Sequence, residues 1–251
     1  MEMTHNKSNG FMIKKATVPT LRLNNGFDMP ILCLGVWRID KNGMRDLIIN
    51  AIKIGYRHFD CAGVGTTGNT YDEDAVLDID TTISLETTWH DMESLVSMGL
   101  VRSIGISNYD VFLTRDCLAY SKVKPAVNKI ETHPYFQCDS LVRFSQKHGI
   151  CVTAHTPLGG AIANAKRFGS DPVSMIQYSK DYKKSLVQIV LRWGIQRNTI
   201  VIPKTSLVKR LEENFNVFDF EITEEDMEII KGVDRKHRTN HPTKVLQKFV
   251  L

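Results

Sequence analysis

The chain has 251 residues, 42% of them hydrophobic and 24% charged, a composition typical of one globular domain. Its formal net charge is only +4, and its lysines and arginines are spread along the whole sequence, which excludes a basic patch for nucleic acid or a membrane surface. The five cysteines are odd in number and form no Cys-x-x-Cys pair, so the sequence argues against a disulfide framework and against a zinc site.

The N-terminal 20 residues are polar and are interrupted by Gly10 and Pro19, so they lack the apolar core of a signal peptide. No later stretch approaches the roughly 18 apolar residues of a membrane span. We therefore expect a flexible extension over residues 1–20 and a single domain over residues 21–251. Reduced cysteines and the lack of a signal core predict a cytoplasmic (cytosolic) protein.

From residue 21 onward, strand patterns alternate with helix patterns. Residues 21–35 predict two short strands joined by an Asn-Asn-Gly turn, and the apolar run 31–34 is the second of them. Further strands are predicted at residues 57–60, 103–106, 126–131, 151–155 and 199–203. Helices are predicted near residues 44–52, 85–99, 110–120, 140–148, 185–196, 207–218 and 224–232.

This alternation predicts a parallel sheet covered by helices, arranged as a barrel or as a doubly wound sheet. We count six core strands, whereas a closed (β/α)8 barrel has eight. Residues 63–84 are rich in Gly, Thr and Asp and predict a long loop, which is unusual inside a compact domain. Two strand–helix units are therefore missing from the pattern.

The last predicted strand leads into a cluster of charged and polar side chains: Lys204, Thr205, Arg210, Glu213 and Asn214. A lysine beside a helix N-terminus and an arginine one turn later suit a phosphate monoester, the group that distinguishes NADP from NAD. Taken alone, the same residues are more typical of a solvated helix face. No Gly-x-Gly-x-x-Gly follows the first strand and no Walker loop is present, which argues against a Rossmann site and against an NTPase.

Eight phrases in the sequence match one protein family in the right order: LNNGFDMP, LGVW, GYRHFD, SIGISNY, ETHPYF, TAHTPLGG, LRWGIQRN and VIPKTS. With them the chain resembles the aldo-keto reductases, and within that family the plant aldose-6-phosphate reductases of the mannose-6-phosphate and sorbitol-6-phosphate type. The resemblance extends over nearly the whole chain from Leu21 onward. It favours the phosphate-binding interpretation of the cluster at Lys204.

The resemblance implies a (β/α)8 barrel of the TIM type that binds NADPH across its C-terminal rim and reduces the carbonyl of a sugar phosphate. The residues that match cofactor positions of the family are Ser107 and Asn108 for the nicotinamide carboxamide, His155 for the stacked ring, Thr156, Leu158 and Gly160 for the pyrophosphate, and Lys204, Thr205, Arg210, Glu213 and Asn214 for the adenosine phosphate and adenine. Lys129 matches the cofactor position at which the family has a glutamine, the partner of Ser107 and Asn108 at the carboxamide, so a cation replaces an amide donor and acceptor there. Trp37 matches a wall of the substrate pocket, and a buried tryptophan at the barrel mouth is the alternative for it.

The family uses a catalytic tetrad of Asp, Tyr, Lys and His, in which the tyrosine donates a proton and the lysine lowers its pKa. Asp60 matches the aspartate. After Ala62 the expected tyrosine segment is missing, and the predicted gap removes the tyrosine, the lysine and the histidine. Tyr71 has three acidic neighbours, which would raise its pKa, so we expect a loop residue. We expect His58 and His133 to be structural.

Three hypotheses remain open from the sequence. The first is an NADPH-dependent aldose-6-phosphate reductase with weak or absent turnover. The second is a non-catalytic NADP-binding or interaction protein, since Lys204 and Arg210 are retained while most of the tetrad is not. The third is an unstable truncated product, because a barrel that lacks two adjacent strands has two unpaired strand edges.

Overall fold

The computed structural model describes residues 18–37, 39, 41–61, 82–159 and 182–239. The strands are β1 (Thr20–Arg22), β2 (Asp28–Pro30), β3 (Leu34–Gly35), β4 (Phe59–Asp60), β5 (Gly105–Ser107), β6 (Val127–Glu131), β7 (Cys151–His155) and β8 (Thr199–Val201). The helices are α1 (Lys41–Ile54), α2 (Leu85–Ser97), α3 (Val111–Tyr120), α4 (Asp139–Lys147), α7 (Leu186–Gln196), α8 (Val208–Phe215) and α9 (Glu224–Lys231). The alternation of strands and helices is thus confirmed, whereas the predicted loop at residues 63–84 lies almost wholly outside the described residues.

The opening hairpin pairs β1 with β2 in antiparallel register, and Gly26 takes a positive φ of 85° in its turn. β1 begins at Thr20, one residue before the predicted start of the domain. The prediction that residues 31–34 form the second hairpin strand was wrong. Within that run, Leu32 forms a parallel bridge to Val201 of β8 instead, and Gly35, just after the run, forms one to Lys204. The run is apolar throughout because it is buried on both faces.

Among the described residues, six parallel strands form the core sheet, in the order β4-β3-β8-β7-β6-β5 once the bridges that join the β3 and β8 regions are included. The sheet curls strongly. Asp60 at the end of β4 lies 2.7 Å from the ammonium of Lys129 on β6, although three strands separate β4 from β6 in this order. A flat, doubly wound sheet would hold these side chains far apart, because neighbouring strands lie about 4.8 Å from one another. The described strands are therefore part of a barrel wall.

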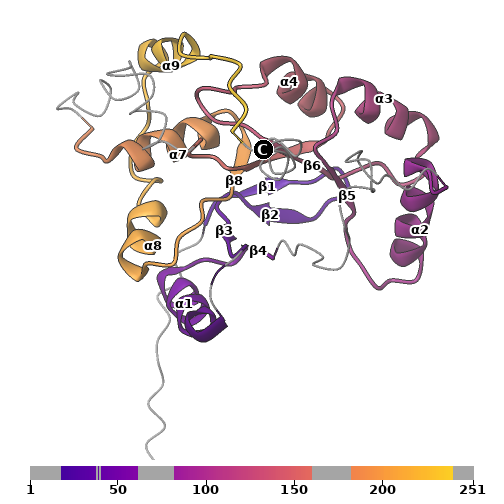
Figure 1. Ribbon diagram of the computed structural model, residues 1–251, viewed down its shortest axis with the longest axis horizontal. Coiled ribbons are helices and arrows are strands. Elements are labelled where there is room, and N and C mark those ends of the chain that lie inside the picture. The colour runs from indigo at the N-terminus through magenta and orange to yellow at the C-terminus, as the bar shows by residue number, and fades with distance from the viewer. Residues whose placement is uncertain (1–17, 38, 40, 62–81, 160–181, 240–251) are drawn as a thin grey trace, which may run out of the picture.

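The described helices surround this wall, as Figure 1 shows: α1 is followed by α8, α7, α4, α3 and α2 around the strands. Neighbouring helices pack in that sequence, with α1 on α8, α8 on α7, α3 on α4 and α2 on α3. On the side of the wall between α1 and α2, no further helix of the described chain lies (Figure 1). The segment that joins these two helices includes residues 62–81, which are not described. The described part of the chain thus supplies six strands of the eight in a closed barrel.

Side chains cap the starts of α2, α3, α7 and α9. Ser84 and Thr223 accept backbone N–H groups at the starts of α2 and α9, and Asp110 does so at the start of α3. Ser185 and Gln188 form a reciprocal capping box at α7. α8 ends at Phe215 and not at residue 218 as predicted.

The core lies between the curled sheet and the helices. Leu34 of β3, Ile200 of β8 and Leu191 of α7 are completely buried, and each such side chain contributes roughly 1.5–3 kcal/mol relative to its exposed state. Tyr56 is also buried, and its hydroxyl donates to the carbonyl of Leu211 at 3.0 Å. These contacts hold β3 and β4 against α7 and α8.

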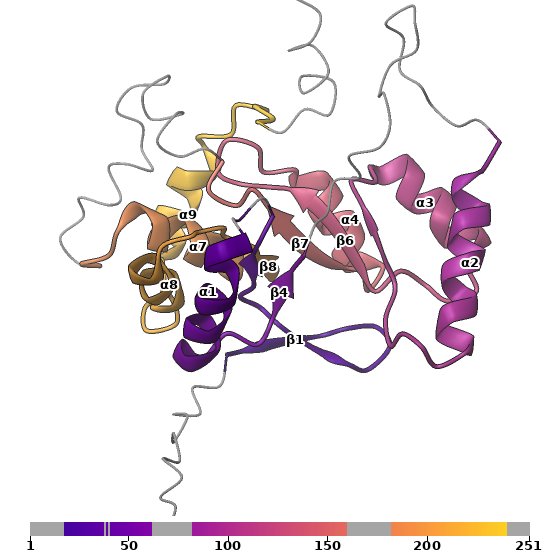
Figure 2. The ribbon, with the colours of Figure 1, turned by 60° about the horizontal axis from the view of Figure 1, so that its bottom comes forward.

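The hairpin closes the N-terminal end of the barrel (Figure 2). Asn24 donates to the carbonyl of Pro125, just before β6, and Asn25 donates to the carbonyl of Arg102, just before β5. The opposite end, where the parallel strands finish, is the end at which barrels of this kind carry their sites. Among the described residues, no helix is both long and apolar enough to cross a membrane.

Candidate active site

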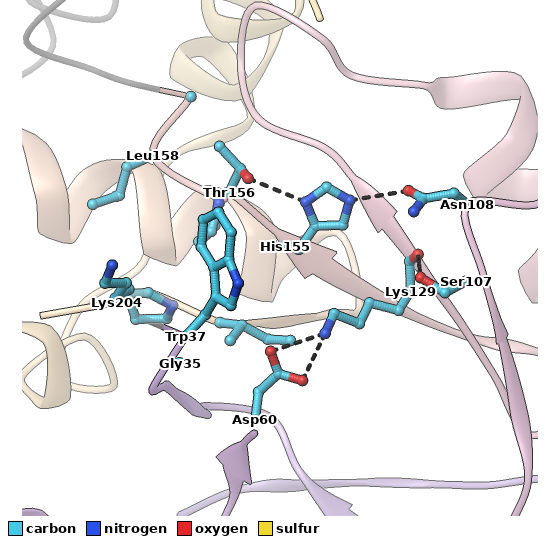
Figure 3. Close-up of a pocket in the computed structure, with 14 residues that line it drawn as sticks. Gly35, Trp37, Asp60, Ser107, Asn108, Lys129, His155, Thr156, Leu158 and Lys204 are labelled. Carbon is cyan, nitrogen blue, oxygen red and sulfur yellow. Dashed lines mark hydrogen bonds and ion pairs between the residues drawn. The ribbon is translucent and has the colours of Figure 1, made fainter. Parts of the chain in front are cut away.

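A pocket of about 450 Å³ opens at the carboxyl ends of the parallel strands. Nine predicted site residues line it: Trp37, Asp60, Ser107, Asn108, Lys129, His155, Thr156, Leu158 and Lys204. They come from all six strands or from the loops that follow them, and Figure 3 shows their side chains around one space. Residues that are far apart in the sequence are thus brought together by the barrel.

The pocket contains a bidentate ion pair that was not predicted from the sequence. The ammonium of Lys129 donates to both carboxylate oxygens of Asp60, at 2.7 and 2.9 Å (Figure 3). The side chains are 26% and 22% exposed, so the pair is partly open to the pocket. The sequence pattern marked both residues, but their pairing depends on the curl of the sheet.

A second network joins the ends of β5 and β7. His155 Nε2 lies 3.1 Å from Asn108 Oδ1, and His155 Nδ1 lies 3.1 Å from Thr156 Oγ1. In the tautomer that suits both partners, Nε2 donates to the amide oxygen and Nδ1 accepts from the hydroxyl. The Ser107 hydroxyl donates to the carbonyl of Lys129 at 3.1 Å. The residues expected to hold a carboxamide therefore already have partners within the protein.

Burial lowers the pKa of His155 from 6.5 to about 4, so its ring is neutral near pH 7. His58 also has a lowered pKa because of burial, and its Nδ1 lies 3.1 Å from the carbonyl of Pro30. A neutral ring offers an aromatic face and one N–H, but no positive charge. His155 therefore suits stacking better than it suits anion binding.

The His155 pKa predicts how stability changes with pH. Because the folded-state pKa lies below the unfolded value, stability from this group is complete above pH 6.5 and is lost as pH falls toward 4. We expect His155→Phe to lose less stability than the wild type between these two pH values, in parallel urea unfolding experiments. The ring signals of His155 followed by NMR give a direct check, and a midpoint at pH 6.5 would contradict the prediction.

Two residues of the pocket have unusual backbone conformations. Asn108 has a φ of 60° and Thr156 has a φ of 52°. Asparagine tolerates this left-handed region, but a β-branched threonine rarely adopts it. Such strained positions concentrate at functional sites, where the surrounding structure holds them in place.

The loop after β7 passes over a buried charged group. Gly159 has a φ of 53°, and a Cβ atom there would lie 2.5 Å from the ring of His133. His133 Nε2 is 3.0 Å from the carboxylate of Glu131, and neither side chain is exposed. The expectation that His133 is structural is supported by this burial. Gly159 lines the pocket, whereas the predicted Gly160 lies outside the described residues.

The cation at the other side of the pocket is Lys204, whose ammonium lies 5.6 Å from the ring centroid of Trp37. The remaining members of the predicted phosphate cluster do not line the pocket. The Thr205 hydroxyl accepts the backbone N–H of Leu207 at 3.0 Å, just before α8. On α8, Arg210 is exposed, Glu213 accepts the Ser185 hydroxyl, and Asn214 is buried at 3% exposure.

The pocket also includes residues that sequence reasoning did not single out as ligands: Gly35, Pro157, Gly159, Ile202 and Pro203. Each lies within two positions of a predicted site residue, so its place near the end of a predicted strand could have identified it as a pocket residue. No tyrosine is among the described residues that line the pocket, and Tyr71 is not described. The described residues also contain no cluster of potential metal ligands.

Three comparisons relate this geometry to known proteins. The aldo/keto reductase family model matches residues 69–235. The NADP-dependent D-sorbitol-6-phosphate dehydrogenase of Malus domestica is 45% identical over 301 residues, which covers 90% of this chain and 97% of that protein. Aldose reductase B of Dictyostelium discoideum is 38% identical and covers 64% of this chain and 50% of its own length.

Solved structures show the same fold. The aldose reductase of Schistosoma japonicum superimposes with a TM-score of 0.80 at 27% identity and covers 90% of this chain and 95% of its own. A Bombyx mori aldo-keto reductase complexed with NADPH gives a TM-score of 0.79 at 26% identity, covering 91% of each chain. The strand order, the position of the pocket and these matches agree, and the chain therefore belongs to the aldo/keto reductase family.

Proposed function

We propose that this chain binds NADP(H) along its pocket and is an NADP-dependent oxidoreductase with weak turnover, which reduces the carbonyl of an aldose 6-phosphate to an alditol phosphate. The observation that carries the proposal is that Lys204, Ser107 and Asn108 line one pocket at the carboxyl ends of the strands. The name of the Malus domestica relative supports both the cofactor and the substrate class.

The pocket fits a nicotinamide nucleotide in volume and in chemistry. Its 450 Å³ lies within the range of small-molecule sites, and its apolar wall includes Trp37 and Leu158. Ser107 and Asn108 carry the hydroxyl and amide groups that a carboxamide needs. Since the Asn108 amide oxygen is paired with His155, binding would exchange one neutral hydrogen bond for another, at little net cost.

A bound NADPH would supply the hydride. Within the protein, Asp60 fixes the position of Lys129, and neutral His155 presents its ring beside Asn108. Lys204 places a positive charge next to the Trp37 ring, where an anionic phosphate group would be attracted. The pocket thus has separate groups for a flat ring and for an anion.

A non-catalytic NADP-binding protein is the second candidate function. It is favoured by the lack of any tyrosine among the described pocket residues. The match to the Malus domestica protein runs over 301 residues, which is more than the 251 of this chain, so that relative has internal residues with no counterpart here. We infer that the gap after Ala62 removes the tyrosine, lysine and histidine of the tetrad, and that Asp60 alone remains.

The binding proposal is tested by titrating the purified protein with NADPH and following nucleotide fluorescence, with NADH as the control. We expect selective binding of NADPH, and we expect the double variant Lys204→Ala/Arg210→Ala to bind it at least about tenfold more weakly, because charge-assisted contacts to a phosphate contribute roughly 1.5–3 kcal/mol. Lys209→Ala is the matched control, since it removes an exposed cation of α8 next to Arg210 that is not assigned to the phosphate.

Equal affinity for NADPH in the wild type and the double variant would contradict the assignment of the phosphate site. If the wild type binds neither nucleotide and also shows no cooperative thermal transition, the third hypothesis, an unstable product, would hold. A cooperative transition without nucleotide binding would leave a folded protein that does not have the proposed function.

A further inference from the structure

Hydrogen bonds hold both the backbone carbonyl and the side-chain ammonium of Lys129 in place. Its backbone carbonyl accepts the Ser107 hydroxyl at 3.1 Å and the Asn108 N–H at 2.9 Å. Two N–H bonds of its ammonium go to the two carboxylate oxygens of Asp60. A lysine ammonium has three donors, and the described residues provide no partner for the third. One directed, positively charged donor thus remains in the pocket.

The surroundings of this ammonium favour a ligand over a purely structural bridge. Lys129 lines the pocket and about a quarter of its side chain is exposed, so a ligand in the pocket can reach the ammonium. The nearby ring of His155 is neutral, and Lys204 stands against Trp37. Lys129 is therefore the positive charge on the β4–β6 side of the described pocket.

We propose that Lys129 binds the oxygen on the reacting carbon of the substrate, with Asp60 as its positioning residue. This inference rests on the proposed function and names the group that would hold the oxygen at C1 of the sugar. During reduction this oxygen gains negative charge, and a fixed cation in a partly desolvated pocket stabilises such charge more strongly than water does. The ligand class is a carbonyl compound or a carboxylate with oxygen at that position.

Two ligands that differ only at C1 test the proposal: D-gluconate 6-phosphate, which carries a carboxylate there, and D-glucitol 6-phosphate, which carries an alcohol. Their affinities are measured by isothermal titration calorimetry at one pH and one salt concentration. For the wild type we expect the carboxylate to bind about tenfold more tightly, a difference of about 1.4 kcal/mol. Lys129→Met should abolish this preference, and Lys129→Arg should keep part of it.

A second variant removes an ambiguity, because Lys129→Met leaves the Asp60 carboxylate unpaired and able to repel the ligand or destabilise the fold. The double variant Lys129→Met/Asp60→Asn removes both charges, and it should also bind the two ligands equally. Lys209→Met is the matched control: it removes an exposed lysine of α8 that does not line the pocket, and it should leave the ratio of the two affinities unchanged.

Persistence of the carboxylate preference in both Lys129→Met and Lys129→Met/Asp60→Asn would overturn the proposal, and so would equal binding, or no binding, of the two ligands by the wild type. These outcomes are separable from those of the NADPH titration. Selective NADPH binding without a Lys129-dependent preference would leave the cofactor proposal standing and remove this inference. A Lys129-dependent preference without NADPH binding would leave this inference standing and remove the cofactor proposal.

Discussion

The purified protein is expected to oxidise NADPH in the presence of an aldose 6-phosphate about 10²–10⁴-fold more slowly than a relative with a complete tetrad, because a positioned general acid contributes a factor of that size. The described pocket retains Asp60 and lacks a tyrosine. Binding and orientation alone would then account for the remaining turnover. The measurement is kcat/KM from NADPH consumption, with the Malus domestica dehydrogenase assayed in parallel.

The control for this measurement is the double variant Lys204→Ala/Arg210→Ala, which should lower any specific turnover further by weakening cofactor binding. A kcat/KM within tenfold of the Malus domestica enzyme would contradict the prediction. It would mean that another group in the pocket supplies the proton, and Lys129 would then be the first residue to substitute. Turnover equal to the background without protein would instead support the non-catalytic candidate.

Glu131→Ala is expected to destabilise the protein by about 3–5 kcal/mol, because removal of one partner from a buried charged network leaves the others unsatisfied. Glu131 is 1% exposed, and its carboxylate accepts the N–H and the hydroxyl of Thr239, both at 2.6 Å. It also lies 3.0 Å from His133 Nε2 and 3.8 Å from Arg238 Nε. It thereby anchors Arg238 and Thr239 at the end of β6.

The measurement is the free energy of unfolding in urea, together with the rate at which a protease cleaves the C-terminal segment of the folded protein. Glu221→Ala is the matched control, because the Glu221 side chain is 83% exposed and its ion pair with Arg192 should contribute only about 0–1 kcal/mol. A loss below 1 kcal/mol for Glu131→Ala would show that this network does not stabilise the fold. Glu131→Gln keeps an acceptor oxygen, so its loss of unfolding free energy should lie between those of Glu131→Ala and Glu221→Ala.

Local patterns in the sequence were sufficient to predict most elements. Ser84 and Thr223 mark helix starts because their side chains satisfy backbone N–H groups only a few positions away. The apolar run at residues 31–34 was assigned to the wrong partner strand, because its apolar residues indicate only that it is buried. Its actual partner, the β8 region, lies some 170 positions later in the chain, and no local pattern identifies it.

The sequence by itself determined the family, the alternation of strands and helices, and the set of residues that approach the strand ends, since these depend on short-range periodicity and on matching phrases. Only the tertiary structure decided which of those residues meet. The curl of six strands brings Asp60 against Lys129 and places Asn108 beside His155, but leaves Arg210, Glu213 and Asn214 outside the lining of the pocket. Contacts across a barrel mouth depend on strand order and curvature, and neither is encoded within any single segment of the chain.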